Sequence, residues 1–386
     1  MIRIAQILGK MNGGGVEQMV MNVYRAIDRT QVQFDFYIFK GSTHVPIDEI
    51  KALGGRIFVV PKLKHPAAYY KSMKKLLGEG GYTIAHCHLS TLSGVALLAA
   101  KNAGIPVRIL HNHSTSGGMR EILRNVAKAA LKPFARAYAT DRLACSQYAA
   151  RWMYGKKSRC TELRDPAPPK ACVRIMRNAV DTQKFAFDPA KRAEIRKAFH
   201  IPQKTLLYGH IGRFCPQKNQ MFLLDIFTEI LKQHKNSMLM MVGEGPDKEL
   251  ITARVIAAKL QNRVIFTGQR NDADKLYSAF DCFIMPSQYE GLPVVGVEAQ
   301  CAGLYCVFSD KITPEVNLTD GAHSLTLKDS AADWACAALC CANVRNEHAA
   351  EQLAEKGYEI SQVATDLLAF YQRRFTEAGG EEQPEE

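Results

Sequence analysis

The sequence contains no apolar run close to the length of a transmembrane helix, which needs about 20 residues. Residues 1–8 are not typical of a signal peptide, because their apolar stretch is short, interrupted by Gln6 and followed by Lys10. The 11 cysteines are an odd number and form no CxxC pair and no zinc-type spacing. These absences argue against a membrane-spanning protein and a disulfide framework, and they predict a cytoplasmic protein with reduced thiols.

Signatures of several functional classes are also missing from the sequence. No RRM, KH, zinc-finger or helix-turn-helix pattern is present, so no nucleic-acid partner is expected. The glycine-rich turn near the start lacks the GxGxxG spacing of nicotinamide enzymes. No DxD-like motif stands in a suitable loop, and we therefore expect no metal and no other cofactor.

Positive charge is present in excess, and it is concentrated in the first half of the chain. Lys and Arg number 50 against 38 Asp and Glu, which gives a net charge of +12. Residues 1–172 hold 26 basic and 10 acidic side chains, whereas residues 173–386 hold 24 and 28. A basic first half predicts an anionic partner, and charge alone does not distinguish a nucleic acid, a membrane surface and a phosphorylated substrate.

Short apolar runs alternate with amphipathic stretches in both halves of the 386-residue chain. This alternation predicts an α/β fold with two Rossmann-like parallel-sheet domains that face each other across a cleft. We expect a first domain at 1–172, with an exposed Pro-rich loop at 156–172, and a second domain at 173–359. A terminal helix at 360–376 and a disordered acidic tail at 377–386 would follow. Strands are expected at residues 2–8, 34–39, 56–60, 84–86, 107–111, 143–145, 173–176, 206–211, 238–242, 264–266, 282–285 and 305–309.

A glycine-rich turn follows the first predicted strand. Gly14 and Gly15 would let backbone N–H groups approach an anion, and the helix that begins beside them adds favourable partial charge. A tight turn without a ligand would account for the same residues.

Two later segments place charged side chains at the ends of predicted strands. In GRFCPQKN (212–219), Arg213 and Lys218 are the residue types that hold a diphosphate, as a bidentate fork and a point charge. In EGLPVVGVE (290–298), Glu290 and Glu298 could accept hydrogen bonds from sugar hydroxyls. Glu298 lies in an apolar run, where an unpaired charge is costly, and this indicates a ligand partner. Solvated surface charges are the alternative interpretation of each segment.

Four histidines occur as two His-x-His pairs at strand ends of the first domain. His86 and His88 form one pair, and His111 and His113 form the other, so both pairs can face the same cleft. Such pairs could bind a metal, but no nearby carboxylate or cysteine completes a site. A single histidine beside a bound phosphate is the better interpretation.

Two basic, amphipathic stretches of the first domain suit an anionic membrane surface, although ordinary solvated faces are the alternative. In one of them basic residues recur at every fourth position, and Pro133 is expected to kink or end the helix. The other combines lysines with Tyr69 and Tyr70. The membrane or acceptor candidates are Lys71, Lys74, Lys75, Arg120, Arg124 and Lys128.

Together these motifs resemble glycosyltransferase family 4, whose members are retaining, nucleotide-sugar-dependent enzymes of the GT-B fold. The resemblance runs from Ile2 to about Tyr371, and its most specific parts are GGGVEQMV, RNAVD, GRFCPQKN, GEGP, FTGQRND and PSQYEGLPVVGVEAQCAGL. The stretch EAQCAGLYCVFSDKITPEV is similar to that of bacterial capsular and exopolysaccharide glycosyltransferases. The chain departs from the family pattern at residues 311–313, where many members have a Gly-rich turn.

The resemblance implies a role for each matching residue. Arg213 and Lys218 would hold the donor diphosphate. Glu298 would hold the ribose hydroxyls, and Glu290 would hold the transferred sugar. His113 is favoured as the family's cleft histidine because small polar residues follow it. The implied catalytic residues are Glu290, His113, His111, Arg213 and Lys218. The implied donor-binding residues are Gly14, Gly15, Arg213, Lys218, Gly243, Gly268, Glu290, Gly291, Leu292 and Glu298.

These roles predict a metal-independent, retaining transferase that moves a sugar from a UDP- or GDP-sugar to a lipid-linked or oligosaccharide acceptor at the inner face of the cell membrane. Two alternatives stay open on the sequence alone. A nucleotide-sugar 2-epimerase of the same fold would convert its donor without releasing the nucleotide. A non-enzymatic basic protein that binds membranes or nucleic acid would be supported by net charge alone.

Overall fold

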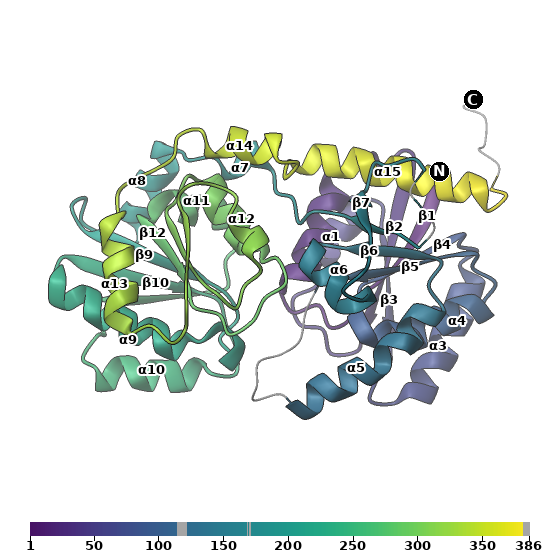
Figure 1. Cartoon of the computed structure of the whole chain (residues 1–386), viewed down its shortest axis with the longest axis horizontal. Coiled ribbons are helices and arrows are strands. Elements are labelled where there is room, and N and C mark those ends of the chain that lie inside the picture. The colour runs from purple at the N-terminus through teal and green to yellow at the C-terminus, as the bar shows by residue number, and fades with distance from the viewer. Residues whose placement is uncertain (114–121, 168, 170, 381–386) are drawn as a thin grey trace. The chain divides into compact units, whose positions relative to one another are not determined.

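The computed structural model describes residues 1–113, 122–167, 169 and 171–380, without the side chains of residues 122–124. Within it the chain forms two compact units (Figure 1). The first unit comprises Met1–Ala179 and Ile360–Glu386, and the second comprises Val180–Glu359. Each unit is built around a parallel sheet with helices on both faces, as the alternating pattern predicts.

In the part of the chain that the structure describes, the first sheet has eight parallel strands in the order β3-β2-β1-β4-β5-β6-β8-β7. Its central strands are almost wholly buried, as strands covered on both faces are, although they contain buried polar residues such as Gln6 and His86. The order reverses between β1 and β4, which creates a topological switch point. The strands are β1 (Ile2–Ile7), β2 (Val32–Phe39), β3 (Arg56–Val60), β4 (Ile84–Cys87), β5 (Val107–Asn112), β6 (Asp141–Ala144), β7 (Cys160–Glu162) and β8 (Val173–Ile175).

Two strands of this sheet differ from the expectation. Strand β8, expected to open the second domain at residue 173, pairs with β6, and the first unit therefore extends to Ala179. Strand β7 lies in the segment 156–172, which was expected to be an exposed loop, and it pairs with β8. The apolar run of β8 identifies a strand but not the sheet that it joins. Strand β7, with the sequence CTE, has no apolar run from which a strand could be predicted.

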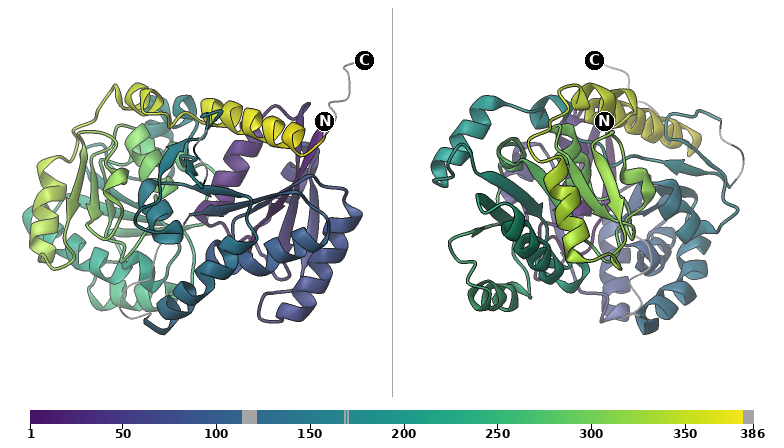
Figure 2. Two further views of the ribbon diagram at one scale, coloured as in Figure 1. Left: turned by 45° about the vertical axis from the view of Figure 1, so that its right-hand side comes forward. Right: turned by 60° about the vertical axis from the view of Figure 1, so that its left-hand side comes forward.

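Helices cover both faces of the first sheet (Figures 1 and 2). Helices α3, α4 and α5 lie on one face, and α1 and α15 lie on the other. Helix α15 packs inward with Leu367, Phe370 and Tyr371, at the three- and four-residue spacing of an amphipathic helix. Helix α5 continues through Pro133, so this proline does not end the helix, and a kink there stays a prediction. The helices are α1 (Gly15–Ala26), α2 (Ile47–Ala52), α3 (Pro66–Glu79), α4 (Ser93–Asn102), α5 (Ile122–Ala137), α6 (Gln147–Tyr154) and α15 (Ile360–Glu377).

The sheet of the second unit has six parallel strands among the described residues, in the order β11-β10-β9-β12-β13-β14. Its switch point lies between β9 and β12. Helices α8, α11 and α12 lie on one face, and α9, α10 and α13 lie on the other (Figure 1). The strands are β9 (Leu206–Ile211), β10 (Ser237–Val242), β11 (Val264–Gly268), β12 (Cys282–Met285), β13 (Cys306–Ser309) and β14 (Ala322–Leu325). The helices are α7 (Thr182–Phe185), α8 (Pro189–Ala198), α9 (Gln220–Gln233), α10 (Lys248–Ala257), α11 (Ala273–Ala279), α12 (Val294–Cys301), α13 (Ala331–Cys340) and α14 (Ala349–Glu355).

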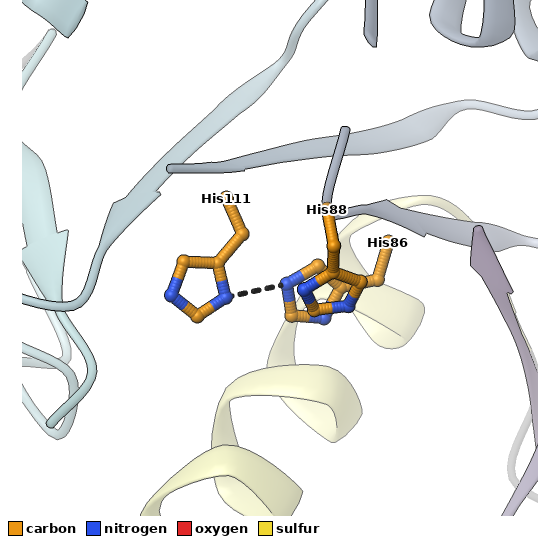
Figure 3. Close-up of side chains that lie close together, drawn as sticks. All are labelled: His86, His88 and His111. Atoms are coloured by element: carbon orange, nitrogen blue, oxygen red, sulfur yellow. Dashed lines mark hydrogen bonds between the residues drawn. The ribbon is translucent and has the colours of Figure 1, made fainter. Parts of the chain in front are cut away.

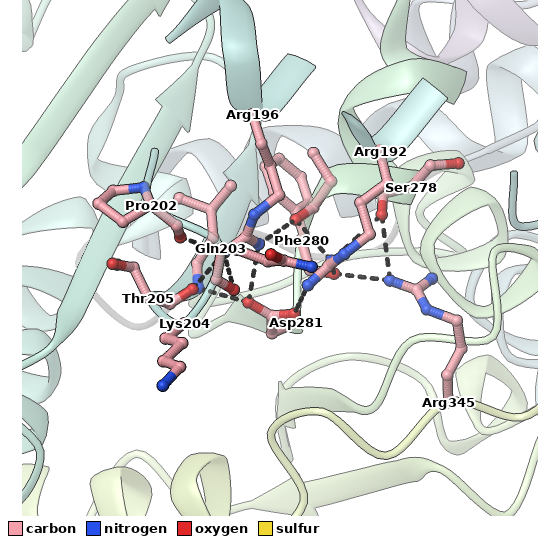
Figure 4. Close-up of polar contacts among 12 residues, drawn as sticks. Arg192, Arg196, Pro202, Gln203, Lys204, Thr205, Ser278, Phe280, Asp281 and Arg345 are labelled. Carbon is pink, nitrogen blue, oxygen red and sulfur yellow. Dashed lines mark hydrogen bonds and ion pairs between the residues drawn. The ribbon is translucent and has the colours of Figure 1, made fainter. Parts of the chain in front are cut away.

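A buried ionic cluster joins α8 to the turn between α11 and β12 (Figure 4). One oxygen of Asp281 accepts a bond of 2.6 Å from Arg192 Nη2. The other oxygen accepts from Arg196 Nη1 at 3.2 Å and from the backbone N–H of Leu207 at 2.7 Å. Arg345 donates to the carbonyl of Phe280 in the same turn at 2.6 Å. Because Asp281 is 4% exposed, these bonds compensate a carboxylate that has lost nearly all its water.

Candidate active site

The predicted donor-site residues of the second unit gather at the carboxyl edge of its sheet. Arg213 follows β9, Gly243 follows β10, Gly268 ends β11 and Glu290 follows β12. The carboxyl ends of parallel strands meet at one edge, and β9 and β12 are neighbours at the switch point. Ligands of open α/β sheets bind at this position. The fold therefore brings together motifs that are far apart in the sequence.

Lys218 and Glu290 form an ion pair at the switch point of the second sheet. Lys218 Nζ lies 2.6 Å from Glu290 Oε1, and the side chains are 15% and 12% exposed. Two further bonds join the same loops: Asn219 Nδ2 donates to Pro286 O at 3.1 Å, and Gln217 Nε2 donates to Tyr289 O at 2.9 Å. The sequence does not reveal this pairing. The ion pair holds an ammonium group beside a carboxylate; the ammonium group recognises phosphate oxygens, and the carboxylate recognises hydroxyl groups.

Glycines let the loops after β9 and β10 touch through their backbones. Gly243 has φ +134°, and a Cβ there would lie 2.2 Å from the carbonyl oxygen of Gly212. A Cβ on Gly245 would lie 2.1 Å from the carbonyl oxygen of Phe214. Any side chain at either position would push the two loops apart. Backbone packing thus accounts for the GEGP motif, and a contact of Gly243 with the donor stays a prediction.

Glu298 lies inside the second unit, where it is 4% exposed. The hydroxyl of Tyr277, from α11, donates to Glu298 Oε2 at 2.9 Å. One partner of this carboxyl is therefore part of the protein, which the sequence pattern does not show. Burial raises the pKa of Glu298 to about 7, although the bond from Tyr277 opposes the shift. A bond from Glu298 to ribose stays a prediction.

We expect Glu298 to make the second unit less stable as the pH rises. The pKa is higher in the folded chain, at about 7, than the ordinary 4.5 of the unfolded chain. Between pH 4.5 and about 7, Glu298 is protonated in the folded chain and ionised in the unfolded chain. Raising the pH across this range therefore lowers the free energy of unfolding by up to about 3 kcal/mol. Urea unfolding of a Trp152→Phe background, followed by the fluorescence of buried Trp334, measures this at pH 5 and pH 8.

Glu298→Gln should abolish this part of the pH dependence in the same measurement. The control is Glu194→Gln, because Glu194 is exposed and pairs with Lys275 at 2.7 Å. In the control, the free energy of unfolding should depend on pH as in the parent. The same pH dependence in Glu298→Gln would contradict the assignment of this effect to Glu298.

Gly14 and Gly15 are exposed at the N-terminus of α1, as the glycine-rich turn predicts. The carboxylate of Glu17 accepts from the backbone N–H of Asn12 at 2.9 Å and of Gly14 at 2.6 Å. An anion that approaches Gly14 would therefore compete with this carboxylate. An acidic residue three positions after the N-cap is the sequence signal of such a capping arrangement.

The four histidines lie together on one face of the first sheet, and Figure 3 shows three of them. His86 and His88, like His111 and His113, are two residues apart, so each pair projects to the same side. The ring centroids of neighbouring histidines are 3.9–5.3 Å apart. Burial lowers the pKa of His86 and His113 to about 3 and also lowers the pKa of the other two, so all four rings are neutral at pH 7. The sequence predicts that the pairs share a side, but not that the rings bond to each other.

Helix α3 carries three of the membrane candidates. Lys71, Lys74 and Lys75 are all exposed, and Lys75 Nζ lies 3.8 Å from a carboxylate oxygen of Glu79. Tyr69, which was expected to contribute to the same basic surface, is completely buried. Its assignment to that surface is wrong, because a residue beside exposed lysines can still lie on the inward side of a helix.

Helix α5 carries the second basic stretch. Arg120 and the side chain of Arg124 lie outside the described residues, and Lys128 is half-buried. Lys132 Nζ lies 3.8 Å from the ring centroid of Trp152, a cation–π contact within the unit. Among the described residues, none of the helices combines the length and the apolar character that crossing a bilayer requires.

Comparisons with known proteins place this chain in a family. The family model described as Glycosyltransferase Family 4 matches residues 13–184, and the one described as Glycosyl transferases group 1 matches residues 191–359. A Bacillus subtilis (strain 168) protein named as the glycosyltransferase EpsF is 34% identical over 379 residues, which cover 96% of each chain. The chain belongs to glycosyltransferase family 4. This confirms the resemblance and the transferase class, and it weighs against the epimerase and binding-protein alternatives.

Two further matches are informative about family 4. The UDP-Gal:alpha-D-GlcNAc-diphosphoundecaprenol alpha-1,3-galactosyltransferase of Escherichia coli is 30% identical over 266 residues, 66% of each chain. The solved structure of Anabaena Alr3699/HepE in complex with UDP and glucose has a TM-score of 0.70 and 16% identity, covering 97% of this chain and 95% of that one. The structural match confirms the GT-B fold.

Proposed function

We propose that this family 4 enzyme transfers a sugar from a UDP-sugar to a lipid-linked glycan, with retention of configuration, during capsular or exopolysaccharide synthesis. The ion pair of Lys218 and Glu290 at the switch point carries the proposal, since it offers a cation to a diphosphate and a carboxylate to sugar hydroxyls. The name of the Escherichia coli relative contains both UDP-Gal and a diphosphoundecaprenol acceptor. The HepE structure contains UDP and glucose. Both support these choices of donor and acceptor.

In this proposal the protein stabilises the charge that develops on the leaving UDP. Arg213 and Lys218 supply positive charge, and the N-terminus of α9 adds partial positive charge. Glu298 accepts hydrogen bonds from ribose, while Glu290 and the backbone of Gly291 and Leu292 hold the transferred sugar. These groups are expected to make the reaction metal-independent.

The first unit would bind the acceptor and an anionic membrane surface. Its exposed lysines on α3, Lys71, Lys74 and Lys75, support peripheral attachment at the inner face of the cell membrane. Gly14 and Gly15 would approach the donor diphosphate, and His113 or His111 would contact the reacting sugar.

A nucleotide titration followed by thermal unfolding tests the donor site. UDP at one hundred times its dissociation constant should stabilise the protein by about 2.7 kcal/mol, whereas GDP, ADP and TDP should have much smaller effects. Glu298→Ala should weaken the UDP effect, and the control Glu194→Gln should leave it unchanged. The absence of a shift with all four nucleotides at millimolar concentration would overturn the donor site. UDP release coupled to glycan formation would separate transfer from epimerisation.

A further inference from the structure

We propose that the amide of Gln6 and the hydroxyl of Tyr371 fix the tautomers of all four histidines in the first unit. As a result, the two end rings, His111 and His113, present opposite hydrogen-bonding groups to a hydroxyl of the substrate. The inference rests on the proposed function, in which one of these rings contacts the reacting sugar. Gln6 and Tyr371 act through the histidines and are positioning residues.

The first chain of hydrogen bonds runs from Gln6 to His111 through Tyr371 and His86. Gln6 Nε2 donates to the hydroxyl oxygen of Tyr371 at 3.0 Å. The hydroxyl proton is then available to His86 Nδ1, which lies 2.6 Å away. The neutral His86 must carry its own proton on Nε2, which donates to His111 Nδ1 at 3.1 Å (Figure 3). His111 is therefore protonated on Nε2.

The second chain starts at the other end of the same amide. Gln6 Oε1 can only accept, so His88 Nε2, at 2.9 Å, must carry a proton and donate it. His88 Nδ1 then accepts from the Nε2–H of His113 at 2.9 Å. His113 is left with a lone pair on Nδ1.

Both chains end in a buried nitrogen without a partner. His111 Nε2 and His113 Nδ1 expose almost no surface and bond to nothing in the part of the chain that the structure describes. The first is a donor and the second is an acceptor. An unpaired buried polar group is costly and calls for an explanation, and a catalytic role is one such explanation. A substrate hydroxyl, which both accepts and donates, matches this combination.

Gln6 couples the two chains because the two ends of its amide differ. If the amide were reversed, every proton along both chains would move to the other ring nitrogen, and the end rings would exchange roles. The orientation of one side chain therefore decides which end ring is the donor. Tyr371 lies on α15, 365 positions from Gln6 in the sequence, so this helix is part of the hydrogen-bond network.

His86, His88 and His111 could also hold a metal ion, because one nitrogen from each lies within 4.8 Å of the others. The hydrogen bonds favour the network instead. His86 Nε2 and His111 Nδ1 already bond to each other, and the group contains no carboxylate to offset the charge of a buried cation. Metal binding is therefore an outcome that the experiment must be able to detect.

Two-bond ¹H–¹⁵N spectra of the full chain, labelled at histidine, report the tautomer of each ring. We expect all four histidines of the cluster to be protonated on Nε2 and bare on Nδ1, with no change between pH 5.5 and pH 8. Protonation of all four on Nδ1 would show the reversed amide and overturn the assigned roles. Different tautomers within one of the two hydrogen-bond chains would overturn the network. A stoichiometric change of the histidine signals on adding Zn²⁺ would also overturn it.

Gln6→Glu tests the role of Gln6 most directly, because a carboxylate accepts hydrogen bonds from both the Tyr371 hydroxyl and His88 Nε2. The Tyr371 hydroxyl would then donate to it, so His86 and His111 should switch to Nδ1–H while the other chain keeps Nε2–H. If all four rings keep their original signals, the role of Gln6 is overturned.

A second variant keeps the test valid if Gln6→Glu does not fold. Tyr371→Phe should move the His86 Nδ1 signal toward that of an unbonded nitrogen. Tyr69→Phe is the control, since it removes a buried hydroxyl that has no partner among the described residues, and its histidine spectrum should match the wild type. An unchanged His86 signal in Tyr371→Phe would overturn the role of Tyr371.

The UDP titration separates this proposal from the proposed function. If UDP stabilises the protein as expected but the tautomers differ from those expected, only the network is overturned. If the tautomers are as expected but UDP does not stabilise the protein, only the donor site is overturned.

Discussion

Glu290→Gln should lower kcat/KM for glycosyl transfer by roughly 100- to 1,000-fold, the loss typical of removing one charge-stabilising group from an active site. The substitution keeps the shape of the side chain but removes the negative charge that pairs with Lys218 at 2.6 Å. The amide also accepts hydrogen bonds from sugar hydroxyls more weakly than a carboxylate does. Because the proposed contact strengthens in the transition state, most of the loss should fall on kcat rather than on KM.

Initial rates with a UDP-sugar and a lipid-linked acceptor measure this effect. Glu194→Gln is the matched control, because it breaks an exposed carboxylate–lysine pair in the same unit. The control should stay within about twofold of the wild type, since exposed pairs contribute little. Retained stabilisation by UDP against thermal unfolding would show that Glu290→Gln is folded. An activity within threefold of the wild type would remove Glu290 from the active site.

Asp281→Ala should destabilise the second unit by about 3–5 kcal/mol, because it removes one partner of a buried ionic cluster. Arg196, whose side chain is 7% exposed, would lose its compensating charge. The backbone N–H of Leu207 would lose its acceptor at 2.7 Å. These groups join α8, β9 and the turn before β12 (Figure 4), so the loss should affect the whole unit.

Urea unfolding in the Trp152→Phe background measures the stability of this unit, because Trp334 is fully buried in it. Asp225→Ala is the control, since Asp225 pairs with Arg254 at 2.8 Å with side chains 45% and 46% exposed. The control should cost less than about 1 kcal/mol. Equal losses in the two variants would show that the buried cluster contributes no more than an exposed pair.

The sequence alone predicts the strands and the class of fold because these depend on local patterns. Apolar runs of strand length, separated by amphipathic stretches, determine that parallel sheets form. Strand ends followed by Gly, Arg or Glu then locate candidate ligand groups, and Arg213 and Glu290 both lie where this reasoning puts them. The two His-x-His pairs follow the same rule, since period-two spacing places both members on one face.

Only the tertiary structure decides which of these groups meet. The pairing of Lys218 with Glu290, the bond from Tyr277 to Glu298, and the addition of β8 to the first sheet all join residues from separate segments. The contact of Gln6 with Tyr371 joins the first strand to the last helix. Local patterns specify elements because propensity and periodicity act over a few residues. Ion pairs, proton positions and pKa values depend instead on burial and on neighbours that only the folded chain brings close.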